Sequence, residues 1–260
     1  MSDIVSSSNR FAISVQGVDF SYVRRDGSFL AVLKNLSLTV EYGEIVGLVG
    51  RNGVGKTTVL EVLRGTLVPQ KGTVRVGQTL VARGGSHHHK PSVALISQRP
   101  DEGLNPTMTV YENYAIATGH KRSALQWAYY KRMRDACHDL MERAGMGIED
   151  KCNEQTRFLS LGQQQAVSVL LALEPPEHLL LMDEPTAALD PFAAERLLDL
   201  ALSEVERVHG AVLLVSHRLG DVTERCSKIF VMSEGAISRN VNNCATTRVT
   251  EEELLASMAN

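Results

Sequence analysis

The spacing of hydrophobic residues predicts an antiparallel pair of strands near the start of the chain. Within 11–15, phenylalanine, isoleucine and valine stand at every second position, and within 36–40 two leucines and a valine do the same. A period of two is typical of strands that are buried on one face. The segment RRDG at 24–27 contains turn-forming residues. We therefore expect two strands that run antiparallel on either side of this turn.

Further along, the strands have a different character. The segments at 44–50, 178–183, 211–216 and 228–232 are continuous apolar runs rather than alternating ones. Such runs suit parallel strands that are buried on both faces. An amphipathic stretch at 192–208 favours a helix between two of them. Together these segments predict an α/β core with an antiparallel β section in front of it.

Between about 100 and 165 the pattern becomes helical, which indicates an insert between two parallel strands. A short helix is also expected at 249–259. Each region contains a threonine followed three residues later by glutamate, the spacing of a capping box at a helix start. These pairs are Thr109 with Glu112 and Thr250 with Glu253.

Composition and charge narrow the function classes. The chain has 260 residues, of which 43% are hydrophobic and 22% charged, as in ordinary globular proteins. Its formal net charge of −3 gives no basic field that would attract nucleic acid. No apolar run approaches the ~18 residues of a membrane span, and the segment 1–10 lacks the apolar centre of a signal peptide. We expect a cytoplasmic protein without nucleic acid as a partner.

Cysteine and histidine patterns predict no metal centre. The four cysteines form no CxxC pair, so free thiols in a reducing compartment are expected: Cys137, Cys152, Cys226 and Cys244. Three adjacent histidines, His87, His88 and His89, are expected on a solvated turn rather than around a metal.

A glycine-rich loop predicts a phosphate-binding site. The segment GRNGVGKTT follows an apolar strand and opens a helix, which is the context that a Walker A loop requires. Its glycines let successive N–H groups face a phosphate, its lysine reaches the β- and γ-phosphates, and the threonine after the lysine can ligate Mg²⁺. The alternative is a turn that only packs a strand on a helix. The predicted residues are Gly50, Arg51, Asn52, Gly53, Val54, Gly55, Lys56, Thr57 and Thr58.

The segment HLLLMDEP at 178–185 supplies acidic side chains at the end of a buried strand. Asp183 is placed to hold the Mg²⁺ shell, and Glu184 to act as general base on the attacking water. A strand that merely ends in two acids is the alternative interpretation. The phosphate-binding loop in the same chain favours the catalytic one.

With these motifs, the sequence resembles the nucleotide-binding subunits of ATP-binding cassette (ABC) transporters, from about Val15 to the tail. The resemblance implies that Tyr22 stacks on adenine and that Gln98 touches Mg²⁺ and the attacking water. It also implies that Asp190 lies near a dimer seam and that His217 contacts the γ-phosphate.

The segment LSLGQ at 159–163 resembles the family's signature motif, commonly Leu-Ser-Gly-Gly-Gln. The resemblance implies contact with the γ-phosphate of ATP held by the opposite subunit. Ser160 and the free N–H groups of a helix start would form this anion site without a formal charge, and a simple helix cap is the alternative. The implied residues are Ser160, Leu161, Gly162 and Gln163.

Two positions depart from the family pattern: Leu161 replaces the usual glycine, and Gln164 stands where many members carry arginine. The Leu161 side chain would either crowd the dimer seam or pack into an apolar pocket of the opposite subunit. Crowding would weaken dimer closure, whereas packing would strengthen it. The two interpretations therefore predict opposite effects of Leu161 on dimerisation.

The implied fold is the α/β P-loop NTPase fold of ABC ATPases, as one domain over 1–260. The antiparallel β subdomain and the RecA-like core would cover 11–98 and 166–245, the helical signature subdomain 99–165, and the C-terminal helix 246–260. The insert is expected to carry the docking surface for a membrane partner. Its groove residues would be Leu104, Tyr111 and Tyr114, unless these form the insert's own core.

The implied function is ATP hydrolysis, with Mg²⁺, that powers a membrane transporter. We expect a homodimer, peripheral on the inner face of the cell membrane, with permease subunits and a solute-binding protein as partners. The absence of a fused membrane span favours an importer of a small organic solute, and a weaker subgroup resemblance points to tryptophan or tyrosine. The alternatives are an ATPase of a lipid- or lipoprotein-handling machine and a non-transport ABC ATPase.

Overall fold

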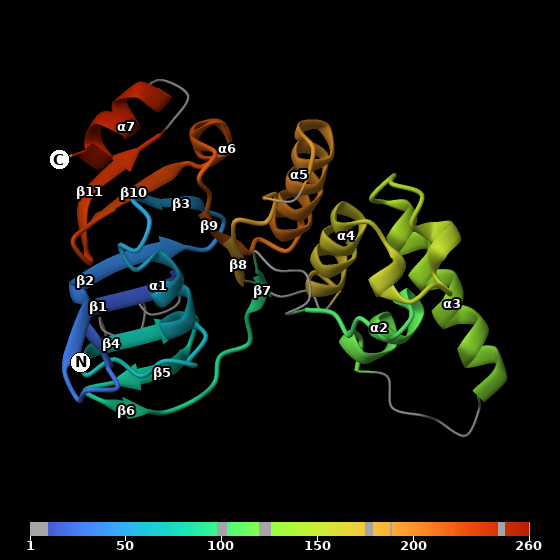
Figure 1. Cartoon of the computed structure of the whole chain (residues 1–260), viewed down its shortest axis with the longest axis horizontal. Coiled ribbons are helices and arrows are strands. Elements are labelled where there is room, and N and C mark those ends of the chain that lie inside the picture. Colours follow the sequence, from blue (N-terminus) through green and yellow to red (C-terminus); the bar gives the residue numbers. More distant parts are fainter. Residues whose placement is uncertain are drawn as a thin grey trace. The chain divides into compact units, whose positions relative to one another are not determined.

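A computed structural model of the chain describes residues 10–97, 103–119, 126–174, 179–187, 189–243 and 248–259. Two compact units are present in it (Figure 1). The first unit comprises the described residues of 1–93, 178–183 and 209–260, and the second those of 94–177 and 184–208.

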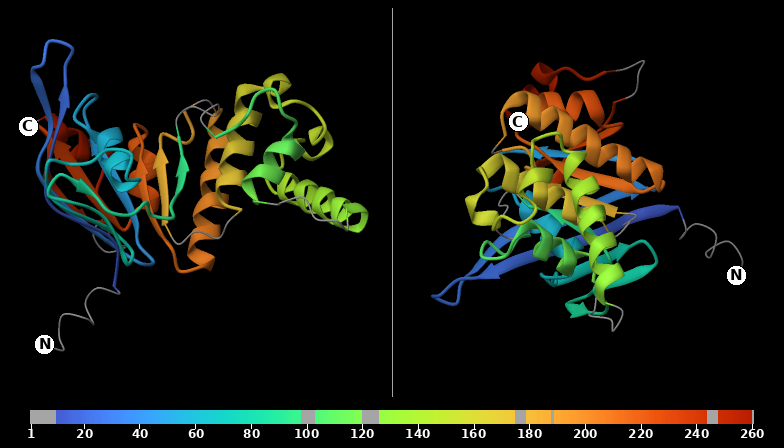
Figure 2. Two further views of the ribbon diagram at one scale, coloured as in Figure 1. Left: turned by 90° about the horizontal axis from the view of Figure 1, so that it is seen from below. Right: turned by 90° about the vertical axis from the view of Figure 1, so that its right-hand side faces the viewer.

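The first unit contains an antiparallel sheet with the strand order β2-β1-β4-β5-β6. The predicted pair of strands is confirmed: β1 and β2 form a hairpin in which Val15 faces Leu38, and their shared end extends past the other strands (Figure 2). In the turn, the Gly27 N–H donates to the Arg24 carbonyl at 2.9 Å. The strands are β1 (Phe11–Val23), β2 (Phe29–Glu41), β4 (Lys71–Val76), β5 (Thr79–Arg83) and β6 (Ser86–His87).

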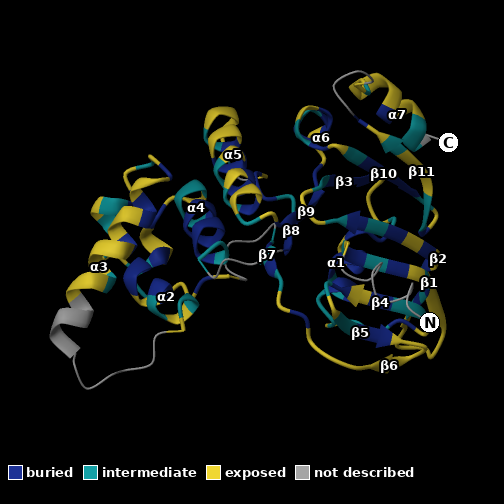
Figure 3. Ribbon diagram, turned by 180° about the vertical axis from the view of Figure 1, so that it is seen from behind, coloured by how far each residue is buried: buried dark blue, intermediate teal, exposed yellow. Residues whose placement is uncertain are grey.

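A second sheet in the same unit holds the continuous apolar runs, in the order β11-β10-β3-β9-β8. The four predicted runs form its parallel strands, and they are almost wholly buried (Figure 3). Because both faces of these strands are covered, no alternation is visible in their sequence. Their bounds are β3 (Ile45–Gly50), β8 (Leu179–Asp183), β9 (Ala211–Val215) and β10 (Lys228–Ser233), with β11 (Ala236–Asn242) antiparallel to β10.

Three helices belong to the first unit: α1 (Lys56–Leu63), α6 (Leu219–Arg225) and α7 (Glu251–Ala259). The predicted cap of the last one is confirmed. The Glu253 N–H donates to Thr250 Oγ1 at 3.2 Å, and the Thr250 N–H donates to Glu253 Oε2 at 3.0 Å. Leu254, the next residue, is fully buried and holds this helix to the unit.

The second unit is mainly helical, as predicted for the insert. Its first helix begins with the predicted capping box, in which the Glu112 N–H donates to Thr109 Oγ1 at 3.1 Å and the Thr109 N–H to Glu112 Oε2 at 2.8 Å. The elements are β7 (Ala94–Ile96), α2 (Val110–Ala117), α3 (Gln126–Glu142), the 3₁₀ turns η2 (Glu149–Lys151) and η3 (Thr156–Phe158), α4 (Leu161–Ala172) and α5 (Pro191–Arg207).

Three residues that were candidates for a docking groove are instead core residues of the second unit. Leu104, Tyr111 and Tyr114 are only 7%, 8% and 5% exposed. Burial also raises the pKa of Tyr114 to about 12, with the nearby carboxylate of Glu174 as a further cause. The prediction that these three side chains form a docking groove is therefore wrong, because a partner protein cannot reach them without opening the core.

Within the described parts of the chain, no helix is both long enough and apolar enough to cross a membrane. The predicted subdomain bounds at 98/99 and 165/166 stay a prediction, and the second unit extends further, to include α5. α4 ends at Ala172, and the two prolines at 175 and 176 lie outside the described residues.

Candidate functional site

The loop between β3 and α1 can be made only with glycine at its two ends. A Cβ on Gly50 would lie 2.6 Å from the Met232 carbonyl oxygen. Gly55 has a φ of +110°, and a Cβ there would lie 2.9 Å from Val32 Cγ1. Side chains at these positions would clash or be strained. The backbone is thereby held tightly between the neighbouring strands.

Lys56 is the first residue of α1 and is only 7% exposed. Its Nζ donates hydrogen bonds to the carbonyl oxygens of Gly50 at 2.8 Å and of Arg51 at 3.2 Å. A buried ammonium needs such partners, because its desolvation is costly. The loop therefore wraps around a positive charge that is already in place.

Asp183, the acid at the end of β8, contacts the start of α1. Thr57 Oγ1 donates to Asp183 Oδ2 at 2.9 Å, across 126 positions of sequence. A hydroxyl and a carboxylate are hard oxygen ligands of the kind that Mg²⁺ takes. The residues present therefore fit the ion.

Two further predicted residues lie in the same unit. Tyr22 is 40% exposed, and its hydroxyl lies 3.4 Å from Thr58 Oγ1, next to the helix start. Its ring and that of Phe20 form a T-shaped pair with centroids 4.9 Å apart. His217 lies two residues after β9 and is exposed.

Glu184 and Asp190 belong to the second unit. Glu184 directly follows β8 and has a φ of +52°, which is uncommon for a residue other than glycine. Such backbone strain is often found at functional sites. Asp190 Oδ1 accepts the N–H groups of Phe192 and Ala193 at 3.1 Å each, so it caps α5.

The start of α4 differs from the prediction in one respect. Ser160 Oγ accepts the Gln163 N–H at 3.2 Å, and the Ser160 N–H donates to Gln163 Oε1 at 3.2 Å. These two N–H groups are used by a capping box, so the expectation that they are free is wrong. Both hydrogen bonds join Ser160 to Gln163 and are exposed to solvent. An anion that used the same two N–H groups would have to displace these bonds.

Leu161 is the first residue of α4 and is 56% exposed. A Cβ on the neighbouring Gly162 would lie 3.1 Å from Leu189 Cδ2. Gln164, the other departure from the family pattern, donates from Nε2 to the Leu159 carbonyl at 3.0 Å. Glycine at 162 thus brings the segment around Leu189 close to this helix start, while the leucine beside it faces outward.

Two further predictions concern Gln98 and the three adjacent histidines. Gln98 lies outside the described residues. His87, His88 and His89 are exposed as expected, but His87 belongs to strand β6 and not to a turn. Among the described residues, the cluster that brings three possible ligand atoms together is a different one, made of the exposed His138, Asp139 and Glu142.

Gln165 was missed by sequence reasoning. It is 1% exposed and donates from Nε2 to the Ser97 carbonyl at 3.2 Å, which ties α4 to the residue before Gln98. Its burial has no signal in the sequence, because it stands in a run of three glutamines.

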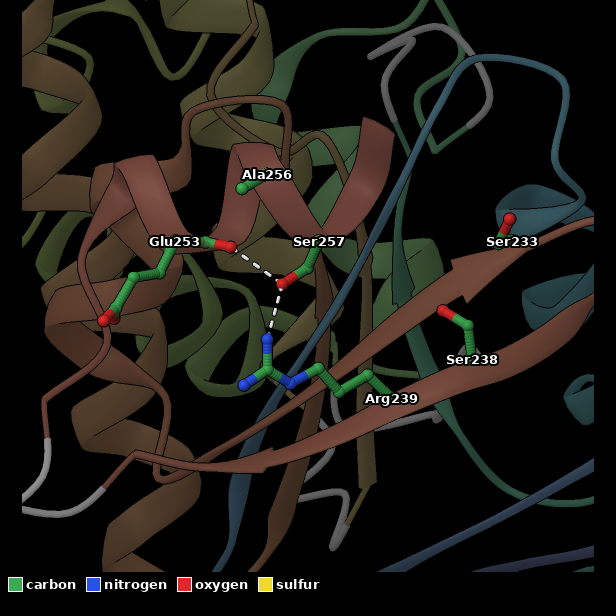
Figure 4. A pocket seen from close by; sticks show the side chains of 6 residues that line it. All are labelled: Ser233, Ser238, Arg239, Glu253, Ala256 and Ser257. Carbon is green, nitrogen blue, oxygen red and sulfur yellow. Dashed lines mark hydrogen bonds between the residues drawn. The ribbon is translucent and has the colours of Figure 1, made fainter. Parts of the chain in front are cut away.

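A polar pocket of about 600 Å³ between β11 and α7 was also not foreseen (Figure 4). Arg239 Nη1 donates to Ser257 Oγ at 2.8 Å, and Ser257 Oγ donates to the Glu253 carbonyl at 2.7 Å. None of the residues that line it is a predicted nucleotide-site residue.

The family model of the ABC transporter family matches residues 33–187. The chain is 25% identical over 243 residues to a tyrosine transport ATP-binding protein of Clostridioides difficile, covering 94% of this chain and 97% of that protein. It is 31% identical over 238 residues to the energy-coupling factor transporter ATP-binding protein EcfA1 of Mycoplasma pneumoniae, covering 91% and 81%.

In three dimensions, the chain is similar to an ATP-binding cassette whose dimer was solved in a post-hydrolysis state with ADP and Pi. The TM-score is 0.77 at 23% identity, over 90% of this chain and 99% of that one. This likeness confirms the predicted α/β cassette fold. Since the family match covers more than half of the chain, the protein belongs to the ABC transporter family and is one of its ATP-hydrolysing, ATP-binding subunits.

Proposed function

We propose that the chain powers a membrane importer of a small organic solute, such as an amino acid, by hydrolysing ATP at the loop between β3 and α1. The observation that carries the proposal is the buried Lys56 ammonium, held by the carbonyls of Gly50 and Arg51 inside a glycine loop. A positive charge at a helix N-terminus is suited to the β- and γ-phosphates.

In this proposal each of the predicted site residues has a defined task. Lys56 and the loop N–H groups bind the phosphates, and the partly exposed Tyr22 stacks on the adenine. Thr57 and Asp183, together with Gln98, hold Mg²⁺. When bound, the ion neutralises charge on the phosphates. His217 donates a hydrogen bond to the γ-phosphate.

Glu184 is proposed as the general base that takes a proton from the attacking water. Its position directly after Asp183 in the chain supports this role, as does its positive φ of 52°. A backbone fixed in this region limits the directions that the carboxylate can take. The side chain is thereby preorganised before ATP arrives.

The signature segment is proposed to complete the site of a second copy of the chain. The exposed start of α4 supports this, because Ser160 and Leu161 are open to solvent. The dimeric form of the similar solved cassette is consistent with it. Ser160 would exchange its local hydrogen bonds for contacts with a γ-phosphate, and Asp190 would lie close to the seam.

Amino acid import is supported by similarity to the tyrosine transport protein of Clostridioides difficile. A homodimer of this chain would then sit on the cytoplasmic face of the cell membrane, bound to permease subunits, with a solute-binding protein delivering the substrate. The ribose import protein of Rhodococcus jostii, 32% identical, supports the broader class of small organic solutes; this chain spans 44% of it.

ATP turnover by the purified chain tests the catalytic part. Glu184→Gln keeps the shape of the side chain but cannot accept a proton, so we expect kcat to fall by about 10²–10⁴-fold while ATP still binds. The matched control is Glu206→Gln on the exposed side of α5, which should retain the wild-type rate. Equal rates in the two variants would contradict Glu184 as the base.

The transport part is tested by isolating the tagged chain from detergent-solubilised native membranes. We expect an integral membrane permease to co-purify. In proteoliposomes, the isolated complex should import labelled tyrosine or tryptophan, and the Glu184→Gln complex should not. Co-purification with ribosomes would instead favour a non-transport ATPase, and with lipoprotein-handling components a lipid machine.

A further inference from the structure

Two of the four cysteines, 15 positions apart in sequence, meet inside the second unit. Cys137 lies on α3 and is fully buried, whereas Cys152 directly follows η2 and is partly exposed. Their sulfur atoms are 3.9 Å apart, close enough for one thiol to donate a hydrogen bond to the other. Cys152 is thus the partly exposed residue of the pair, and Cys137 is the buried one.

Cys152 also stands where three elements join. Its carbonyl accepts the Tyr111 N–H of α2 at 3.0 Å. Its Sγ lies 3.9 Å from the Ile148 carbonyl oxygen at the start of η2. Together with the contact to Cys137 on α3, these interactions make the cysteine pair the meeting point of α2, α3 and η2.

The charges around the pair make the two thiols unequal. The pKa of Cys152 is lowered, chiefly because Cys137 donates a hydrogen bond to it and also because His138 and Arg134 are near. Burial and the carboxylate of Glu149 act in the opposite direction without reversing the shift. Since the thiolate is the nucleophilic form, Cys152 is the thiol that reacts with an oxidant.

Cys137 is kept protonated. Its pKa is raised, first because its proton is held in the hydrogen bond to Cys152 and second because it is buried. The carboxylate of Glu174 raises the pKa further, and Arg134 acts weakly against this. Cys137 is therefore slow to react by itself and is held next to the sulfur that reacts first.

We propose that Cys137 and Cys152 are a redox modification site that forms a reversible disulfide when the chain meets a peroxide. The Cys152 thiolate attacks one peroxide oxygen, the O–O bond breaks, and Cys152 becomes a sulfenic acid with release of hydroxide, or of an alkoxide from an organic peroxide. Cys137 then attacks the Cys152 sulfur, the S–O bond breaks, and water leaves. Two thiols are oxidised and one peroxide is reduced.

The geometry requires little movement for this bond. A disulfide has an S–S length of about 2.05 Å, so the 3.9 Å separation must close by about 2 Å. Two side chains share this displacement. The bond would join α3 covalently to the segment that leads from η2 into α4, and the signature Ser160 begins only eight positions later. Oxidation would thus restrain the part of the chain in front of the signature helix.

The test oxidises the purified full chain with one equivalent of hydrogen peroxide. We expect titratable thiols to fall from four to two per chain, because the chain has four cysteines and the pair uses two. Peptide mapping should show residues 137 and 152 cross-linked, and dithiothreitol should restore all four thiols. Four remaining thiols, or a Cys152 oxidised without a cross-link, would overturn the proposal.

Two variants assign the roles. In Cys137→Ser, Cys152 should stop at the sulfenic acid, which dimedone traps; in Cys152→Ser, Cys137 should remain a thiol. Cys226 is the internal control, because burial raises its pKa to about 12 and it should stay reduced throughout. A cross-link from Cys152 to Cys226 or Cys244 would also contradict the pairing. None of these outcomes depends on the proposed transport function.

Discussion

The helix starts of α1 and α4 are both predicted to face phosphate, yet they are built in opposite ways. At α1 the cap is Gly55 in a left-handed conformation, without a side-chain cap, and a buried lysine follows it. At α4 the cap is Ser160, whose side chain and N–H are both engaged with Gln163. The start of α1 has no side-chain cap for an anion to displace. At the start of α4, the N–H groups of Ser160 and Gln163 are already hydrogen-bonded.

Under the proposed function, the α1 segment binds ATP by itself and the α4 segment only assists, and the two caps give a physical reason for this division. An anion that arrives at α1 gains hydrogen bonds and a formal positive charge without replacing an existing cap. An anion that arrives at α4 must first displace the local bonds of Ser160. We infer that the signature segment contributes only when a second copy brings it to ATP that is already bound.

The largest expected effect is at Lys56. Lys56→Ala removes the buried positive charge at the start of α1, and hydrogen bonds to charged groups are worth about 1.5–3 kcal/mol. ATP affinity should fall by roughly 10- to 150-fold in a nucleotide titration. Lys71→Ala, which removes an exposed lysine of the same unit paired with Asp19, is the control and should bind normally. Near-normal ATP affinity of the Lys56→Ala variant would contradict the assignment of this loop as the phosphate-binding site.

A second prediction tests how tightly the α1 loop is held. Gly55→Ala should lower the free energy of unfolding by about 2–3 kcal/mol, because the new Cβ clashes with Val32 and its φ is positive. Gly53→Ala is matched in the sign of φ but has open space around the Cβ, so about 1 kcal/mol is expected. Denaturant melts measure both, and equal losses would contradict the packing argument.

At α4, the third prediction separates capping from nucleotide contact. Ser160→Ala should cost about 1 kcal/mol of stability through the lost cap, and it should also weaken ATP-dependent dimerisation. Thr109→Ala removes the same kind of capping box from α2, with a similar cost in stability and no effect on dimerisation. If both variants dimerise equally well, Ser160 is only a helix cap.

The smallest effect is expected at Leu161, where the sign decides between crowding and packing. We predict that Leu161→Gly strengthens ATP-driven dimerisation by about 1 kcal/mol, or roughly fivefold. Leu255→Gly on α7 is the control, since these leucines are 56% and 55% exposed. Weaker dimerisation of the Leu161 variant would show that the leucine packs into the opposite subunit.

Much of the fold was predictable because local signals and tertiary contacts agree. The four apolar runs became buried parallel strands, and both predicted capping boxes formed. The short strands β4, β5 and β6 were not predicted. β4 pairs with β1, β5 with β4, and β6 with β5, and no local pattern in 71–87 reveals this series of pairings.

The site could be predicted where chemistry and sequence spacing coincide. Thr57 and Asp183 were each expected to hold Mg²⁺, and the structure places them in hydrogen-bond contact although 126 positions separate them. Burial of Tyr111 and Tyr114 was left open because an aromatic residue on a helix suits a groove as well as a core. The pairing of Cys137 with Cys152 had no signal either, since it arises from how α3 packs on η2.

The central claim is that each ATP is held by α1 of one chain and α4 of another. Sedimentation velocity of the Glu184→Gln variant with and without ATP tests it most directly, alongside a variant that also carries Ser160→Arg. We predict that ATP converts the single variant to a dimer, and that the double variant binds ATP with similar affinity but stays monomeric. An ATP-bound single variant that remains monomeric, or a double variant that still dimerises, would contradict the account.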